Sequence, residues 1–579
     1  MGTRAAPLQI TGTGGAMNKD WHELVSRPQH RVNTEKDVFV GMRDGVRVAV
    51  DIYRPDANVK VPALLGISPY GKDVQKLPIF EYPTDRDLGN GGIEAGDTEY
   101  FVSRGYAHVI AEARGTGASE GSYGVFTGKE QQDGYDLVEW IAKQPWCDGN
   151  VGMLGMSYFG MIQLLVAAQN PPHLKAIFPV DAATDMYRHW AYHGGILHLS
   201  FLATWWDSSL VVNSAKRADL PPAELKAIVE NLLDDPDVRC HPRLYKTLRW
   251  PQKNPHLFDV LIHPFDGPYY WERSACSKFG KINIPCHLLS RWSAPYIHLP
   301  GAFSAYGQIN APRKLMITVP ESGVGFSRPW HENHDIVLRW YDHWLKGIDT
   351  GVMDEPPITI LVQGSNQWRH ENEWPLARTH WTRLYLGAQG RLKDELPGWN
   401  ERPDGFTNAV GLQPGGKVPS LRYATEALAA DTEVTGPIAL YLFAAISSAD
   451  TNWIVEINDV DADGTETRVS IGWLKASHRE LDQSRSKPYK PYHPHTGAIP
   501  VDPGRVYEYA IEICDTSYVF KAAHRLQLVV KAQDAPWEGT SYIYRLSNHL
   551  SASRETRHTI YHKPEFPSHL LLPVVPGHG

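Results

Sequence analysis

The segment Asn150-Val151-Gly152-Met153-Leu154-Gly155-Met156-Ser157-Tyr158-Phe159-Gly160 carries the clearest structural signal in the chain. Residues 151–154 form a short apolar run typical of a buried strand, and residues 161–168 (MIQLLVAA) form an apolar run of helical length. A strand, a tight turn with a central serine and a helix make up a nucleophile elbow, which exposes the Ser157 hydroxyl at the carboxyl end of the strand. The usual pattern is G-x-S-x-G, but here Phe159 occupies the place of the second glycine and Gly160 follows it. The alternative is an ordinary strand-to-helix loop, and the flanks on both sides favour the elbow.

Apolar runs on both sides of this segment predict further strands of the same sheet. They cover residues 61–68, 106–112, 175–180, 284–290 and 314–319. Residues 129–144 have apolar side chains at helical spacing, and residues 336–346 form an amphipathic helix. Strands that alternate with helices predict a doubly wound, parallel α/β sheet. Such sheets bind ligands at the carboxyl ends of their strands, where Tyr70, Arg114, Ser157 and Asp181 fall.

Two regions lack this alternation. Residues 185–281 are rich in Trp, His and Leu and carry helical signals, which predicts an all-helical cap over the strand ends. Beyond residue 379, short β runs separated by turn signals predict a β-sandwich or jelly roll. The predicted divisions are an N-terminal arm (1–35), the two parts of the α/β domain (36–184 and 282–378), the cap (185–281) and the jelly roll (379–579).

The composition is that of a globular protein with more than one core. The chain has 579 residues, of which 42% are hydrophobic and 21% charged, and its net charge is −8. A negative chain without a basic run is a poor partner for nucleic acid or for an anionic membrane. We expect neither a signal peptide nor a membrane span, because no apolar run is long enough. The five cysteines include no C-x-x-C pair, so we expect free thiols and a cytoplasmic protein.

Two other motifs are compatible with ligand binding but fit a structural role better. The glycine-rich loop at residues 114–121 lacks both the Walker lysine and the G-x-G-x-x-G spacing of nucleotide-binding loops, so we expect a structural bend. Asp459, Asp461 and Asp463 resemble the start of a Ca²⁺ loop, but the closing glutamate is not at its place and a plain turn is expected. The sequence therefore predicts neither a metal ion nor a cofactor.

Six motifs taken together resemble the CocE/NonD family, the cocaine-esterase and X-Pro dipeptidyl-peptidase-like serine hydrolases. They are RGTGASEG (114–121), PWCDGNVGMLGMSYFG (145–160), AIFPVDAATDMY (176–187), RWYDHWLKGIDTG (339–351), VTGPIALYLF (434–443) and PSHLLLPVVP (567–576). The resemblance runs from about residue 36 to the end of the chain. It implies an α/β-hydrolase domain, a helical cap and a C-terminal jelly roll.

The same resemblance implies roles for three residues. Ser157 corresponds to the nucleophile of the family. Tyr70, in Ser68-Pro69-Tyr70, corresponds to the tyrosine whose hydroxyl contributes to the oxyanion hole, and the backbone N–H of Tyr158 is the second donor. Such donors stabilise the charge that develops on the substrate oxygen in the transition state.

The chain departs from the family pattern at the partners of the serine. The family aspartate follows a G-W-Y-D sequence, but Arg291-Trp292-Ser293-Ala294 places Ala294 there. The family histidine follows a G-P-W-x-H sequence, and Gly323 stands in its place. A serine hydroxyl without a base is a poor nucleophile, so another residue must take over this role.

Three replacements are open from the sequence. His298 lies one helical turn beyond Ala294 and could act as the base, with Glu321 or Asp181 as its acid. His331 or His334, before the closing helix, could instead reach the serine, although both could equally flank that helix. Alternatively, Ser157 acts without a full triad, or the site performs other chemistry with His193 and His198 of the cap as acid and base.

The sequence therefore predicts a serine hydrolase, or an acyl-transferring relative, that cleaves an ester or amide of a small molecule with an apolar or aromatic acyl part. Ser157 attacks the carbonyl, Tyr70 and the Tyr158 N–H hold the oxyanion, and His298 moves the proton. The alternative is a scaffold without hydrolysis, working as a lyase, isomerase, cyclase or binding protein. A homodimer is compatible with the sequence.

Overall fold

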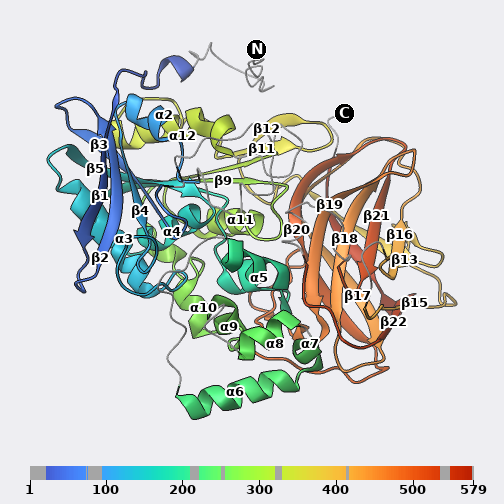
Figure 1. Cartoon of the computed structure of the whole chain (residues 1–579). Helices are drawn as coiled ribbons and strands as arrows, with labels where there is room; N and C mark the ends of the chain where they lie inside the picture. Colours follow the sequence, from blue (N-terminus) through green and yellow to red (C-terminus); the bar gives the residue numbers. More distant parts are fainter. Residues whose placement is uncertain are drawn as a thin grey trace.

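The chain folds into an α/β domain and a β domain, with the helices of the cap lying between and below them (Figure 1). The computed structural model describes residues 21–73, 75, 94–208, 221–240, 242–249, 255–319, 329–411, 416–534 and 548–576. The helices and strands observed within these ranges confirm the predicted fold class.

The α/β domain is built on a sheet whose order is β1-β2-β4-β3-β5-β6-β9-β10-β11-β12. The strands β4 to β11 of this order are parallel, and β1, β2 and β12 add antiparallel edges. The bounds are β1 Val32–Gly41, β2 Arg47–Pro55, β3 Val61–Ser68, β4 Ala107–Glu112, β5 Cys147–Met156, β6 Leu174–Val180, β9 Cys286–Arg291, β10 Arg313–Thr318, β11 Ile358–Val362 and β12 Gln367–Glu371. Parallel strands buried on both faces explain why β3, β5 and β6 are nearly continuous apolar runs.

Helices cover both faces of this sheet, and the alternation of side chains along the strands assigns each face to its helices. Along β5, Val151 and Met153 belong to the core shared with α3 and α4, whereas Leu154 and Met156 belong to the core shared with α12. The helices are α2 (Thr98–Ser103), α3 (Gly128–Ala142), α4 (Tyr158–Ala167), α11 (Leu299–Gln308) and α12 (Pro329–Lys346), preceded by a short turn of 3₁₀ helix, η1 (Trp21–Glu23). Helix α11 packs on the same face as α3 and α4.

The cap is mostly helical, but the prediction of an all-helical insertion is wrong at one place. A short hairpin, β7 (Tyr192–His193) and β8 (Ile196–Leu197), interrupts it because Gly194 and Gly195 both adopt positive φ and turn the chain back. The remaining elements are η3 (Met186–Ala191, a π-helix), α5 (Leu199–Ser208), α6 (Pro222–Asp234), α7 (Pro236–Cys240), α8 (Pro242–Arg249), α9 (Pro255–Leu261), α10 (Pro268–Arg273) and η5 (Phe279–Lys281).

The β domain closes on itself, because its last strand, β24, pairs with both β13 and β17. A closed set of strands leaves few unpaired edges. The strands are β13 His380–Gly387, β14 Arg391–Lys393, β15 Asp404–Thr407, β16 Ser420–Ala424, β17 Thr432–Ile446, β18 Asn452–Val460, β19 Glu466–Lys475, β20 Tyr507–Phe520, β21 Arg525–Lys531, β22 Arg557–Lys563, β23 Phe566–Pro567 and β24 His569–Val575, with a 3₁₀ turn, η6, at Ala476–His478. Asp461 forms a tight turn between β18 and β19, where its carboxylate accepts from the N–H groups of Asp463 and Thr465.

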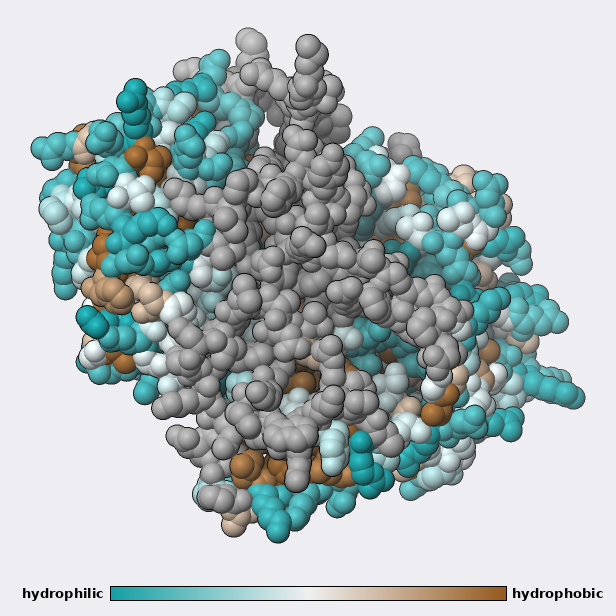
Figure 2. Space-filling model, viewed as in Figure 1, coloured by the Kyte–Doolittle hydropathy of each residue, from teal (hydrophilic) through white to brown (hydrophobic). Residues whose placement is uncertain are grey.

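The face of the molecule seen in Figure 2 is mostly hydrophilic where the structure describes it, with small, separate apolar areas. Among the described helices, none combines the length and the apolar character needed to cross a bilayer.

Candidate active site

Ser157 lies in the sharp turn between β5 and α4, in a conformation that few residues adopt. Its φ is 55° and its ψ is −117°, outside the regions favoured for a residue with a Cβ. The turn is held by hydrogen bonds from Ser157 N to Val180 O (2.9 Å) and from Met156 N to Glu94 O (2.9 Å). Every other residue from Val151 to Ala168 is buried, and Ser157 alone is partly exposed. This is the geometry of a presented nucleophile.

The displaced glycine of the elbow motif has a steric reason. A Cβ at Gly160 would lie 2.4 Å from the carbonyl oxygen of Val180, so helix α4 can approach β6 only if this residue is glycine. The position of the usual second glycine holds Phe159, whose ring is buried and packs against Tyr70 (centroids 6.3 Å apart). In this elbow, the glycine required for the contact between α4 and β6 is therefore Gly160.

Among the described histidines, His298 lies within hydrogen-bonding distance of Ser157. Its Nε2 lies 3.3 Å from Ser157 Oγ. His298 directly precedes α11, and its backbone N–H donates to Ala294 O (3.2 Å). Its backbone is therefore held by Ala294, the residue that stands where the family has its aspartate. Hydrogen bonds between a catalytic base and its nucleophile are often long before substrate binds.

Burial keeps the imidazole of His298 neutral. It lowers the pKa of His298 to about 4, while the negative charge of Asp181 raises it and the positive charge of Arg291 lowers it further. At neutral pH, His298 therefore carries no charge. With its proton on Nδ1, Nε2 can accept the proton of the serine hydroxyl.

Asp181 follows β6 and is completely buried beside this pair. Its Oδ1 accepts from Ser290 Oγ (2.9 Å) and its Oδ2 accepts from Arg291 Nε (2.8 Å), both on β9. Arg291 is equally buried and forms an ion pair with the carboxylate. Within the described residues, Asp181 acts on His298 through its charge and forms no hydrogen bond with it.

Tyr70 lies beside the residues that follow the nucleophile. Its ring meets the ring of Tyr158 edge-on, with centroids 5.9 Å apart. Its hydroxyl oxygen accepts a hydrogen bond from the indole Nε1 of Trp205 in α5 (3.0 Å). The cap therefore takes part in orienting the predicted oxyanion tyrosine, a contact that the sequence does not predict.

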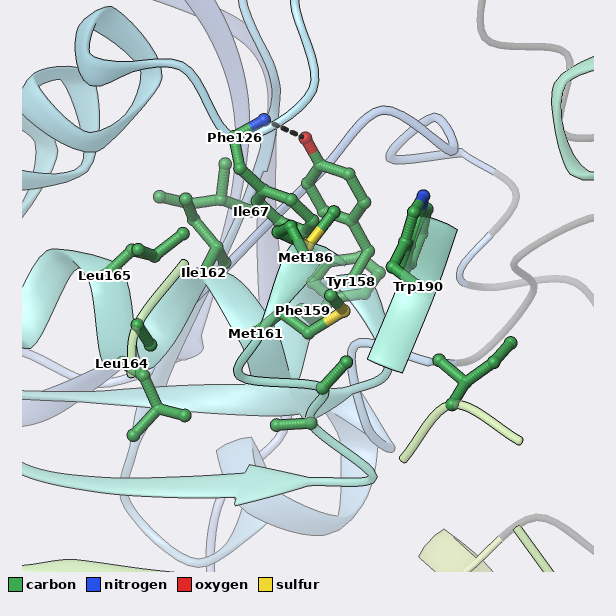
Figure 3. Close-up of a cluster of buried hydrophobic side chains, with 14 of the residues drawn as sticks. Ile67, Phe126, Tyr158, Phe159, Met161, Ile162, Leu164, Leu165, Met186 and Trp190 are labelled. Atoms are coloured by element: carbon green, nitrogen blue, oxygen red, sulfur yellow. Dashed lines mark hydrogen bonds between the residues drawn. The ribbon is translucent and has the colours of Figure 1, made fainter. Parts of the chain in front are cut away.

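The side chain of Tyr158 is held by a buried polar network under the elbow. Its hydroxyl donates to Glu130 (2.8 Å to Oε1) and accepts from Tyr123 (3.0 Å) and, more weakly, from Phe126 N (3.4 Å). Figure 3 shows Phe126 stacked on Tyr158, with Trp190 close by. Burial raises the pKa of Glu130 to about 8. Glu130 is not among the residues predicted from the sequence, although Thr127-x-x-Glu130 is a capping-box pattern that points to it.

The N–H of Tyr158 belongs to the first turn of α4. N–H groups of a first helical turn have no acceptor within the helix and carry the positive end of its dipole. Since this group follows Ser157 directly, it can donate to an oxygen that forms beside the serine.

Two of the other predicted residues cannot be placed, and two have other partners. Glu321 and the side chain of His331 lie outside the described residues. His334 stacks on Tyr100 (4.9 Å) and meets Phe101 edge-on, in the core of the α12 face. The guanidinium of Arg114 pairs with Asp133 and Asp44, which gives it a structural role.

His193 and His198 contact the β domain. His193 Nδ1 lies 2.8 Å from His549 Nε2, and His549 Nδ1 lies 2.8 Å from Asp534 Oδ2. His198 packs against both imidazoles (4.4 and 5.2 Å between centroids). His193, His198 and His549, which we call the junction histidines, join the cap to the β domain.

Comparison with known proteins gives two family matches that together span most of the chain. Residues 44–320 match the family described as X-Pro dipeptidyl-peptidase (S15 family), and residues 350–571 match the X-Pro dipeptidyl-peptidase C-terminal non-catalytic domain. The cocaine esterase of Rhodococcus sp. is 28% identical over 93% of this chain and 98% of its own length. A putative serine esterase of Mycobacterium bovis is 27% identical over 88% of this chain and 92% of its own.

Solved structures show the same fold. A CocE/NonD family hydrolase from Staphylococcus aureus superposes with a TM-score of 0.77 at 23% identity, covering 98% of this chain and 100% of that one. An α-amino acid ester hydrolase superposes with a TM-score of 0.73 at 18% identity, covering 99% and 100% of the two chains.

Proposed function

Because the chain belongs to the X-Pro dipeptidyl-peptidase (S15) family of ester and amide hydrolases, we propose that it cleaves a small-molecule carboxylic ester through an acyl-enzyme on Ser157. The observation that carries the proposal is the 3.3 Å approach of His298 Nε2 to Ser157 Oγ on a strained turn. Neither the family matches nor the site geometry supports the alternative of a scaffold without hydrolysis.

The reaction proceeds by ordinary acyl transfer. Ser157 Oγ attacks the carbonyl carbon while His298 Nε2 takes its proton, and the oxyanion meets the Tyr70 hydroxyl and the Tyr158 N–H. When the tetrahedral intermediate collapses, His298 returns the proton to the leaving alcohol and the acyl group stays on Ser157. Water then attacks the acyl-enzyme carbonyl while His298 accepts a proton from it. When this second intermediate collapses, the bond to Ser157 Oγ breaks, His298 returns the proton to Oγ and the acid is released.

Aromatic side chains around the elbow support an apolar or aromatic acyl part. The ring of Trp205 lies parallel to that of Tyr158 (centroids 6.4 Å) and meets Trp190 edge-on (5.2 Å). Aromatic faces and edges bind flat, uncharged groups well.

Two carboxylates near the described site are already engaged and are not available to the free amino group of a peptide. Asp181 is paired with Arg291, and Glu130 is held by Tyr158 and carries a raised pKa. This engagement supports an uncharged ester as the substrate. A base with a lowered pKa also suits an ester, whose alkoxide leaves more readily than an amide nitrogen.

A cytoplasmic location is part of the proposal, supported by the free thiols of the four described cysteines.

A fluorophosphonate probe tests the proposal directly. We expect stoichiometric labelling of the wild type, no labelling of Ser157→Ala, and unchanged labelling of Ser304→Ala, a matched serine control on α11. Hydrolysis of a p-nitrophenyl benzoate should be lost in the same variant. Unchanged turnover in Ser157→Ala, or an unlabelled wild type, would overturn the proposed function.

A further inference from the structure

Two buried charges of opposite sign lie beside His298, and they act on it in opposite directions. Asp181 and Arg291 are both essentially inaccessible to solvent and bind each other through Oδ2 and the guanidinium. In a buried site, electrostatic interactions are screened less than in water, so both charges act on the neighbouring imidazole. The carboxylate favours the protonated imidazole, and the guanidinium opposes it.

This arrangement differs from a serine-hydrolase triad. There, a buried carboxylate accepts a hydrogen bond from the histidine Nδ1–H and stabilises the imidazolium that forms during reaction. Here, both carboxylate oxygens of Asp181 accept hydrogen bonds from β9: Oδ1 from Ser290 and Oδ2 from Arg291. The predicted acid of His298 is therefore present but paired with a cation.

We propose that Arg291 is a positioning residue for the proposed reaction: by binding Asp181, it withholds this carboxylate from His298 and sets the pH range in which the imidazole can act as the base. The inference rests on the proposed function, because it concerns the base of that reaction. If Arg291 has this role, ester hydrolysis should continue in mildly acidic solution. A histidine that is hydrogen-bonded to a carboxylate without a cation partner would already be protonated there.

Other charged groups on the elements around α11 are engaged elsewhere. Arg313 of β10 donates to Tyr306 O, and Lys314 of the same strand donates to Glu355 O. On β20, Glu512 pairs with Lys490, and Asp515 accepts from Trp374 Nε1. On β9, the imidazole of His287 stacks on Phe178 in the α12-face core, and Lys281 of η5 is exposed. Asp181 and Arg291 are the charged groups that act on His298 within the described chain.

A cycle of neutralising variants separates the two charges. The acid limb of kcat/KM for an uncharged p-nitrophenyl ester is measured in the wild type, Arg291→Gln, Asp181→Asn and the double variant. Arg291→Gln leaves Asp181 to favour the imidazolium, so its acid limb should move to higher pH by about one to three units. Asp181→Asn should move it to lower pH, and the double variant should return it close to the wild-type position.

Two further measurements keep the inference falsifiable if a variant folds poorly. Arg291→Lys keeps the positive charge and should keep the acid limb within about half a pH unit of the wild type, well short of the shift expected for a lost charge. The rate of fluorophosphonate labelling should show the same pH shifts without any substrate. A purely structural role for Arg291 predicts lower activity at every pH with an unmoved limb, and this result would overturn the inference.

The outcome also separates this inference from the proposed function. If the probe labels Ser157 but the limb is the same in wild type and Arg291→Gln, only the role of Arg291 fails. If Ser157 is not labelled at all, the proposed function fails with it.

Discussion

His298 and His193 are both buried imidazoles, yet they occupy opposite kinds of surroundings. Burial lowers the pKa of both. His298 faces the partly exposed hydroxyl of Ser157, whereas His193 faces a second imidazole, His549, that is bound to Asp534. Burial therefore favours the neutral form of both histidines. The group that faces the imidazole nitrogen determines whether the histidine is placed to accept a proton or to join the cap to the β domain.

The comparison predicts that changes at His298 affect activity, and changes at the junction histidines affect stability. His298→Gln keeps an amide nitrogen or oxygen near the Nε2 position but removes the base, so kcat/KM should fall by about 10³-fold or more. His193→Asn, the matched buried control, should leave kcat/KM within about threefold, because it touches no reacting group. Steady-state kinetics on one activated ester decides this, and equal losses in both variants would abolish the distinction.

The next largest effect concerns the oxyanion donor. Tyr70→Phe removes one hydroxyl that meets the developing charge, so kcat should fall by about 10²- to 10³-fold. Its thermal midpoint should change little, since a neutral hydrogen bond such as that from Trp205 Nε1 is worth about 1 kcal/mol. Tyr441→Phe removes a comparable hydrogen bond to Pro488 O in the β domain and serves as the control. A small change in kcat for Tyr70→Phe would remove this residue from the oxyanion hole.

Acidification should weaken the junction. Around the cap hairpin, burial lowers the pKa of His478 to about 4 and holds those of His193 and His495 well below their ordinary value. The unfolded chain binds protons at these groups below pH ~6.5 while the folded chain does not. Stability is therefore complete above that pH and is lost as the pH falls toward 4, by roughly 1.4 kcal/mol per pH unit for each such group.

Thermal midpoints at several pH values test this expectation. The midpoint of the wild type should fall between pH 6.5 and 4, and His193→Asn should show a shallower fall than the wild type. Parallel curves for the two proteins would show that protonation of His193 does not contribute.

The smallest expected effect is at Glu130. Its folded pKa of about 8 is raised above the ordinary value by burial, so its contribution to stability is complete at low pH and lost as the pH rises toward 8. Glu130→Gln mimics the protonated acid and keeps an acceptor for the Tyr158 hydroxyl. We expect a midpoint that is less sensitive to pH between 6 and 9, with activity at pH 7 within a few-fold of the wild type. An unchanged alkaline decline would contradict the role of Glu130.

Much of the fold could be predicted because local patterns agree with it. The buried parallel strands β3, β5 and β6 are apolar runs, and α3 has helical spacing. The sequence does not predict the β7–β8 hairpin, because each strand has only two residues, too few for a periodic signal. Its turn residues, Gly194 and Gly195, were the only local indication.

The candidate site could be predicted only in part. The elbow turn predicts Ser157, and the position of His298 four residues after Ala294 predicts a replacement base; the structure places the two side chains together. Their catalytic roles remain predictions. The pairing of Asp181 with Arg291 and the contact of Trp205 with Tyr70 could not be predicted, because both join residues more than 100 positions apart. Contacts of this kind depend on strand order and on how the cap lies over the sheet.

The backbone of the cap hairpin is locked into the β domain. Lys475 N donates to Gly194 O (2.8 Å) and Leu550 N donates to Leu197 O (2.9 Å). A Cβ at Gly194 would lie 2.1 Å from Trp473 O, so even alanine is excluded there. Anyone grafting the C-terminal half of a relative onto this enzyme must therefore transplant the hairpin with it. A chimaera without the matching hairpin would lose these backbone hydrogen bonds between the cap and the β domain.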